Sequence, residues 1–164
     1  MLQQFKQMLE NTGGKFFETK SLEFIKKDLD QLLKKGEYVV NTIPAIGLVN
    51  TEIDISDHAI SLAAVDRVIL KSSLGVAENG SVWLTEKDMV NRLLPFICQH
   101  LVIVLEQSNI VANMHEAYKK IGKADVGYHV FISGPSKTAD IEQSLVIGAH
   151  GARSMLVYLV GNMN

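Results

Sequence analysis

The run His100-Leu101-Val102-Ile103-Val104-Leu105 is the feature that most constrains the fold of this chain. Its consecutive apolar residues leave no polar face, which is typical of a strand buried on both sides of a parallel sheet. A second apolar run, residues 155–160, follows after a helical pattern at residues 110–121 and a β-type run at residues 128–132. This β-α-β order predicts an α/β fold with a parallel core and right-handed crossovers.

Two helices are predicted in the amino-terminal part. Residues 2–11 carry apolar side chains at helical spacing, and the glycines of Asn11-Thr12-Gly13-Gly14 stop that helix because glycine adopts left-handed conformations easily. A short strand is expected at residues 15–17. Ser21 is then a suitable N-cap for the clearest helix of the sequence, which extends to Gly36.

Strands and a hairpin are predicted in the middle of the chain. Residues 37–43 are β-branched and aromatic and end at Pro44, as a strand should. Residues 65–70 predict a further strand. Two apolar β-type runs flank Asn79-Gly80, a pair that strongly indicates a hairpin turn.

Composition excludes several classes of protein. The 164 residues are enough for one domain, which we expect to span residues 1–164. The net charge of -2 and the dispersed Lys and Arg residues argue against nucleic-acid binding. The lone Cys98 permits no internal disulfide and is too few for an iron–sulfur or structural zinc site, so we expect no metal in this chain. No apolar run approaches the roughly 20 residues of a membrane span, so we expect a soluble protein. The single free cysteine fits a reducing, cytoplasmic setting.

The stretch from Phe131 to Glu142 holds the main candidate site. A strand ends at Ser133-Gly134-Pro135, and the next residues predict a helix over about 138–147, so Ser133, Gly134, Ser136 and Thr138 gather where a sheet meets a helix start. Free backbone N–H groups and the helix dipole can bind an anion there. The alternative is that Ser136 or Thr138 only caps the helix. Asp140 and Glu142, in its first turn, would oppose a plain anion. They favour a ligand that also presents donors, or a structural role in which Asp140 makes a fixed hydrogen bond to the loop.

Three further residues are candidates. Glu78, beside the Asn79-Gly80 turn, could act as a nucleophile or general base, or could merely flank the turn. His150 could transfer protons near neutral pH or could be a structural hydrogen-bonding residue, and Arg153 offers a planar fork for a small carboxylate or for an acidic group of a partner. In a parallel β-α-β unit, the connection that carries His150, Gly151 and Arg153 would lie at the opposite end of the sheet from Ser133. The two clusters then meet only if the loop folds back, the last strand runs antiparallel, or two protomers associate.

The motif Ser133-Gly134-Pro135-Ser136-Lys137-Thr138-Ala139-Asp140-Ile141-Glu142, followed by Gly148-Ala149-His150-Gly151-Ala152-Arg153, resembles the signature of the lactate-utilisation protein C family, the LUD domain. The Glu78-Asn79-Gly80 turn and the Arg92 to His100 approach to a strand resemble its upstream landmarks. The resemblance covers about residues 65–160. Asn79 stands where the family more often has Thr, and Ala152 where it often has Pro.

The resemblance implies a three-layer α/β sandwich with a mostly parallel central sheet, similar to the sugar-phosphate isomerase and CoA-transferase group that includes 5-formyltetrahydrofolate cyclo-ligase. It also implies a role in bacterial oxidation of lactate to pyruvate, alongside separate iron–sulfur partner proteins that would carry the metal clusters.

Three functional hypotheses follow, in order of preference. The first is a subunit of a lactate-oxidising system that binds a small carboxylate or a partner at the loop of residues 133–140. The second is a CoA-transferase-like enzyme in which Glu78 accepts an acyl group. The third is a non-catalytic scaffold.

Overall fold

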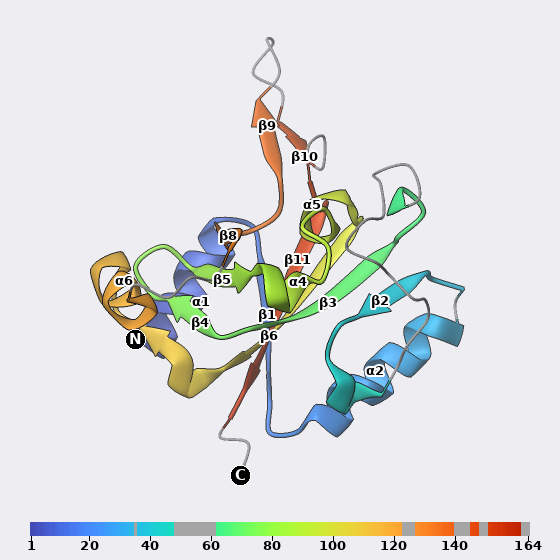
Figure 1. Ribbon diagram of the computed structural model, residues 1–164, viewed down its shortest axis with the longest axis horizontal. Helices are drawn as coiled ribbons and strands as arrows, with labels where there is room; N and C mark the ends of the chain where they lie inside the picture. The colour runs from blue at the N-terminus through green and yellow to red at the C-terminus, as the bar shows by residue number, and fades with distance from the viewer. Residues whose placement is uncertain (35, 48–61, 123–126, 140–144, 148–150, 162–164) are drawn as a thin grey trace.

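The structure is a computed structural model that describes residues 1–34, 36–47, 62–122, 127–139, 145–147 and 151–161 (Figure 1). All structural statements below concern this part of the chain. None of its helices is long and apolar enough to cross a membrane.

The central sheet confirms the predicted parallel core. Its described strands are all parallel, in the order β1-β11-β6-β3-β2. They are β1 (Lys15–Thr19), β2 (Val39–Asn41), β3 (Arg67–Ser72), β6 (His100–Glu106) and β11 (Ser154–Val160). Strand β6 lies in the middle, and its residues 101–105 are buried on both faces, as the uninterrupted apolar run predicts.

Helices cover both faces of this sheet (Figure 1). On one face, α2 (Leu22–Lys34) packs Ile25 and Leu29 against β2, β3, β6 and β11. On the other face, α1 (Leu2–Asn11) packs Phe5 and Leu9 into the largest hydrophobic core. The same core includes residues of two short helices, α4 (Glu86–Met89) and α5 (Leu94–Ile97). Short 3-10 helices, η1 (Pro44–Ile46) and η2 (Gln107–Asn109), follow β2 and β6.

A second sheet lies beside α1 and was not expected from the sequence. Its described strands are ordered β7-β4-β5-β8. They are β4 (Leu74–Val76), β5 (Ser81–Thr85), β7 (Ile110–Val111) and β8 (His129–Ile132). The antiparallel β4–β5 pair confirms the hairpin at Asn79-Gly80. Helix α6 (Met114–Ile121) covers the outer face of this sheet through Ala117.

Two predictions about the carboxyl-terminal part are wrong. The strand at residues 128–132 exists as β8, but it pairs antiparallel with β5 and does not join the parallel core. The helix expected over 138–147 is replaced in the described residues by β9 (Lys137–Ala139) and β10 (Leu145–Ile147), which form an antiparallel hairpin that projects from the body (Figure 1). Leu145-Val146-Ile147 is rich in β-branched residues, and cross-strand pairing outweighs the helical spacing of the apolar residues.

Candidate functional site

The loop of residues 133–137, which we call the signature loop, is fixed to two neighbouring turns. Gly134 has φ +74°, and a Cβ atom there would lie 2.6 Å from the carbonyl oxygen of Thr12. Only glycine permits this close approach to the turn after α1 without strain. On its other side, the Ser133 hydroxyl donates a hydrogen bond to the carbonyl oxygen of Asn79 at 2.7 Å. The signature loop therefore lies between the turn after α1 and the β4–β5 turn.

The two halves of the signature motif meet within one chain. The backbone N–H of Ser136 donates to the carbonyl oxygen of Ala152 at 2.9 Å. A Cβ atom on Gly151 would lie 3.1 Å from the Ser136 Cβ. The loop can reach this point because β8 belongs to the second sheet, so the chain that leaves it arrives at the start of β11. The separation predicted for a parallel β-α-β unit does not apply here.

A cleft of about 350 Å³ opens where these segments meet. Its walls are mostly apolar, and its polar side chains, Ser133, Ser136 and Lys137, all come from the signature loop. Phe96 of α5, an aromatic residue that is 37% exposed, also lines the cleft. Such a cleft, apolar with a few polar groups at one side, is the usual form of a small-ligand site.

The helix-start argument for anion binding at this loop is wrong, because β9 begins at Lys137 where a helix was expected. Ser133 is not at the carboxyl end of a parallel strand either, since β8 runs antiparallel to β5. Of the other predicted residues, Thr138 lies in β9, Arg153 is exposed before β11, and Asp140 and His150 lie outside the described residues. What remains for an anion is the Lys137 ammonium group and the Ser136 hydroxyl.

Glu78 has a structural role that the sequence did not reveal. Its Oε2 atom accepts a hydrogen bond from the backbone N–H of Met114 at 2.8 Å, at the first residue of α6. The Asn113 side chain accepts from the backbone N–H of Glu116 at 2.9 Å. Together they satisfy N–H groups that the helix cannot pair internally. Glu78 and Ser133 are linked only through Asn79, whose carbonyl oxygen Ser133 contacts.

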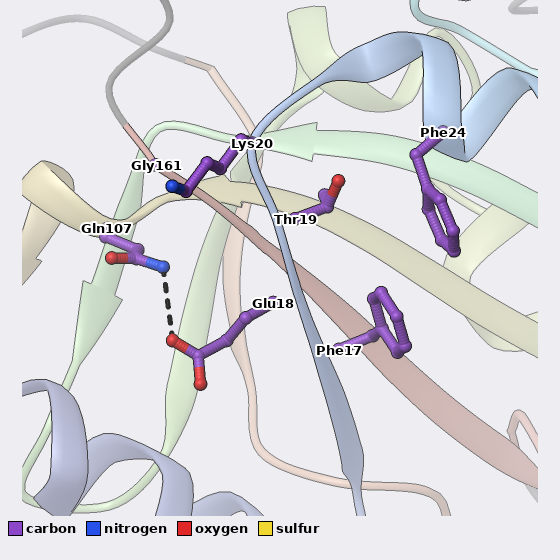
Figure 2. Close-up of a pocket in the computed structure, with 7 residues that line it drawn as sticks. All are labelled: Phe17, Glu18, Thr19, Lys20, Phe24, Gln107 and Gly161. Atoms are coloured by element: carbon purple, nitrogen blue, oxygen red, sulfur yellow. Dashed lines mark hydrogen bonds between the residues drawn. The ribbon is translucent and has the colours of Figure 1, made fainter.

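The carboxyl edge of the parallel sheet, where sites of α/β proteins usually lie, holds a separate cavity. It has a volume of about 470 Å³ and lies at the ends of β1, β6 and β11 (Figure 2). Of the predicted site residues that the structure describes, none lines it. Its lining consists of Phe17, Glu18, Thr19, Lys20, Phe24, Gln107 and Gly161.

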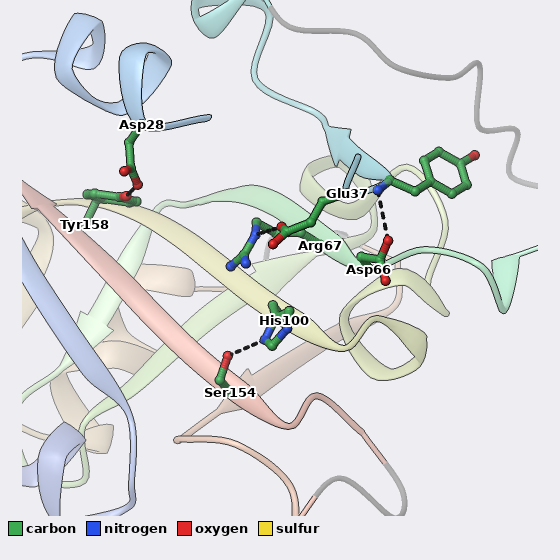
Figure 3. A network of polar contacts seen from close by, with 8 residues as sticks. Asp28, Glu37, Asp66, Arg67, His100, Ser154 and Tyr158 are labelled. Carbon is green, nitrogen blue, oxygen red and sulfur yellow. Dashed lines mark hydrogen bonds and ion pairs between the residues drawn. The ribbon is translucent and has the colours of Figure 1, made fainter. Parts of the chain in front are cut away.

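The amino edge of the sheet carries a polar row that was not predicted from the sequence. Arg67, His100 and Ser154 are register partners on β3, β6 and β11. Arg67 pairs with Glu37 at 2.9 Å, and Nδ1 of His100 lies 2.8 Å from the Ser154 hydroxyl (Figure 3). Burial, and after it the positive charge of Arg67, lowers the pKa of His100 below its ordinary value of 6.5. Only the register of parallel strands brings these residues together.

Comparison of the sequence with models of known protein families assigns the chain to a family. The model of the LUD domain matches residues 51–160, more than half of the sequence. The chain belongs to the LUD domain family. This match confirms the resemblance drawn from the signature motif. The predicted α/β fold is confirmed as well: a DUF162 family protein from Deinococcus radiodurans superimposes with a TM-score of 0.73 over 98% of this chain and 96% of its own. At 18% identity, that likeness concerns the fold alone.

Curated relatives of this LUD protein share a limited segment with it. Lactate utilization protein C of Bacillus pumilus is 34% identical over 89 residues, which cover 51% of this chain and 37% of that protein. Lactate utilization protein C of Shouchella clausii is 35% identical over 85 residues, or 49% and 37% of the two chains. The match thus accounts for little more than a third of the length of these relatives.

Proposed function

We propose that this LUD protein is a component of a bacterial lactate-utilisation system, which oxidises lactate to pyruvate together with separate iron–sulfur proteins. The family match and the names of the curated relatives support this role. Because the relatives share only about a third of their length with this chain, we assign it the role of a binding or assembly subunit.

Within that role, we propose that the cleft at the signature loop binds a small carboxylate. The hydrogen bond from Ser136 to Ala152 carries the proposal, because it joins both halves of the family motif around one cleft. The Lys137 side chain passes over Gly13: a Cβ atom on that glycine would lie 3.1 Å from Lys137 Cε and Nζ. The Ser136 side chain lies beside Gly151, and both Ser136 and Lys137 line the cleft. The Lys137 ammonium group can make a charge-assisted hydrogen bond to a carboxylate, and the Ser136 hydroxyl can donate a second one.

The test is a titration of the protein with lactate, pyruvate and phosphate while its thermal unfolding is followed. A ligand present at 100 times its dissociation constant adds about 2.7 kcal/mol to the free energy of unfolding. For a chain of this size, the Tm should rise by about 5–10 °C. Lys137→Gln should abolish the rise in Tm. The control variant Lys119→Gln, which changes an exposed lysine of α6, should preserve it. An unchanged Tm with all three ligands would remove them from consideration.

Assembly with a partner is tested separately. If this chain is a subunit of a lactate-oxidising system, a pull-down from native cells at low salt should recover an iron–sulfur protein. Recovery of no such protein would count against the subunit role, even where a carboxylate binds.

The alternative of an acyl transfer to Glu78 has weaker support, because the Glu78 carboxylate already accepts a hydrogen bond from the first residue of α6. Incubation with a panel of acyl-CoA molecules, followed by mass spectrometry, tests it. A mass increase on Glu78 that hydroxylamine removes would establish the transferase, and no adduct with any acyl group would eliminate it.

A further inference from the structure

The cavity at the carboxyl edge of the central sheet, which we call the edge cavity, has one aromatic side. The rings of Phe17 on β1 and Phe24 on α2 stack in parallel, with centroids 4.9 Å apart and planes at 2° (Figure 2). Both side chains remain about half exposed, at 46% and 44%. Such exposure of large apolar side chains beside a cavity is typical of a binding surface.

The rings of Phe17 and Phe24, which we call the aromatic wall, are supported by Tyr158 of β11. Tyr158 of β11 meets the Phe17 ring edge-on, with centroids 6.2 Å apart. The Tyr158 hydroxyl in turn donates a hydrogen bond to Asp28 of α2. These contacts connect β11, α2 and the aromatic wall. A ligand that packs against Phe17 and Phe24 therefore needs to order these side chains little, which lowers the entropic cost of binding.

The opposite side of the edge cavity is cationic. Glu18 points its carboxylate toward Gln107 (Figure 2), and its charge is neutralised by an ion pair with Lys6. No ion pair between described residues involves Lys20, which therefore leaves the lining with one uncompensated positive charge.

Gly161, directly after β11, is one of the residues that line the cavity. Among the described residues, no atom would lie within 4 Å of a Cβ atom at this position, and its backbone does not have the positive φ that requires glycine. A larger side chain there would enter open space without a clash in the protein.

From this combination we propose that the edge cavity binds an aromatic carboxylate, with its ring packed against Phe17 and Phe24 and its carboxylate paired with Lys20. The volume of about 470 Å³ falls within the usual range for a site that encloses a small organic molecule. The site is distinct from the cleft at the signature loop and shares no residue with it. It does not depend on the lactate-utilisation role.

Three probes separate the contribution of the aromatic ring from that of the carboxylate. 3-Phenyllactate carries both a ring and a carboxylate, lactate lacks the ring, and 2-phenylethanol lacks the charge. Titrations followed by amide NMR should show 3-phenyllactate shifting Gly161 and Phe24 with a Kd of about 0.1–2 mM, as the usual affinity per ligand atom suggests. The other two probes should bind there at least about tenfold more weakly.

Two variants and a control complete the test. Lys20→Gln should weaken 3-phenyllactate about tenfold, and Gly161→Leu should abolish binding by filling the cavity, while the Tm of both variants stays near that of the native protein. Lys119→Gln should leave the affinity unchanged. Shifts confined to Ser136 and Gly134, or an affinity that neither variant alters, would overturn the proposal.

Oligomeric state gives an independent outcome. Light scattering should show that Phe24→Ser does not change the mass of the particle. If this variant instead breaks a dimer, the aromatic wall is an interface between two copies, and the proposed ligand site is wrong.

Discussion

The contact between Gly134 and Thr12 provides the sharpest test of how the signature loop is held. In Gly134→Ala, the new methyl group would lie 2.6 Å from the Thr12 carbonyl oxygen and 2.8 Å from its hydroxyl. One of those atoms belongs to the backbone, so a side-chain rotation cannot relieve the overlap. The loop or the turn after α1 must move.

A matched control separates this overlap from backbone strain. Gly47 also has a left-handed conformation, with φ +70° and ψ 12°, but among the described residues the nearest neighbour of an added Cβ atom would be the flexible Lys26 ammonium group at 3.6 Å. Gly47→Ala therefore costs about 1 kcal/mol, because left-handed strain of about 1–2 kcal/mol is partly offset by lost freedom in the unfolded chain.

The overlap in Gly134→Ala adds about 1–3 kcal/mol of overpacking, so this variant should lose about 2–4 kcal/mol in total. For a chain of this length the Tm should fall by about 4–16 °C, against about 2–4 °C for Gly47→Ala. Urea unfolding followed by circular dichroism measures both variants. Equal losses in the two would refute the reasoning, since the fixed position of the signature loop against Thr12 would then contribute nothing.

Two further predictions concern titratable groups. The pKa of His100 is lowered in the folded protein, so just below pH 6.5 the unfolded chain binds more protons than the folded one. The free energy of unfolding should therefore fall as the pH drops from 6.5 through the folded-state pKa. His100→Gln should make this pH dependence less steep, and an equal slope in the variant and the native protein would contradict the assignment. Burial raises the pKa of the Cys98 thiol to about 12, so at pH 8 the native thiol is both buried and protonated. Because only the thiolate reacts, a disulfide reagent at this pH should label Cys98 only after denaturation. Rapid labelling of the native protein would show that the thiol is accessible.

Local sequence patterns predicted most of the elements. Helices α1 and α2, the hairpin at Asn79-Gly80 and strand β6 each follow from spacing, turn residues or apolar runs within a few residues of one another. The helix pattern at residues 110–121 was correct only from Met114, because Ile110 and Val111 extend the second sheet as β7.

The candidate site could be predicted only in part. The family motif identified the signature loop and residues 151–153, yet the reason given for their function, a helix start at residue 138, was wrong. Phe96 and the edge cavity were missed, because nothing in the local sequence indicates that residues from separate elements line one space. For the polar row at the amino edge, the sequence offers a local signal: the polar residues Arg67 and His100 each stand directly before an apolar run.

The sequence by itself determined the parallel core, since the apolar runs of β6 and β11 have no polar face and must be buried on both sides. Only the tertiary structure decided which sheet β8 joins and that residues 137–147 contain a hairpin. Both choices depend on partners distant in the sequence, β5 for one and the opposite hairpin strand for the other. These long-range contacts supply the free energy of strand pairing. The resulting arrangement of strands places Ser136 next to Ala152.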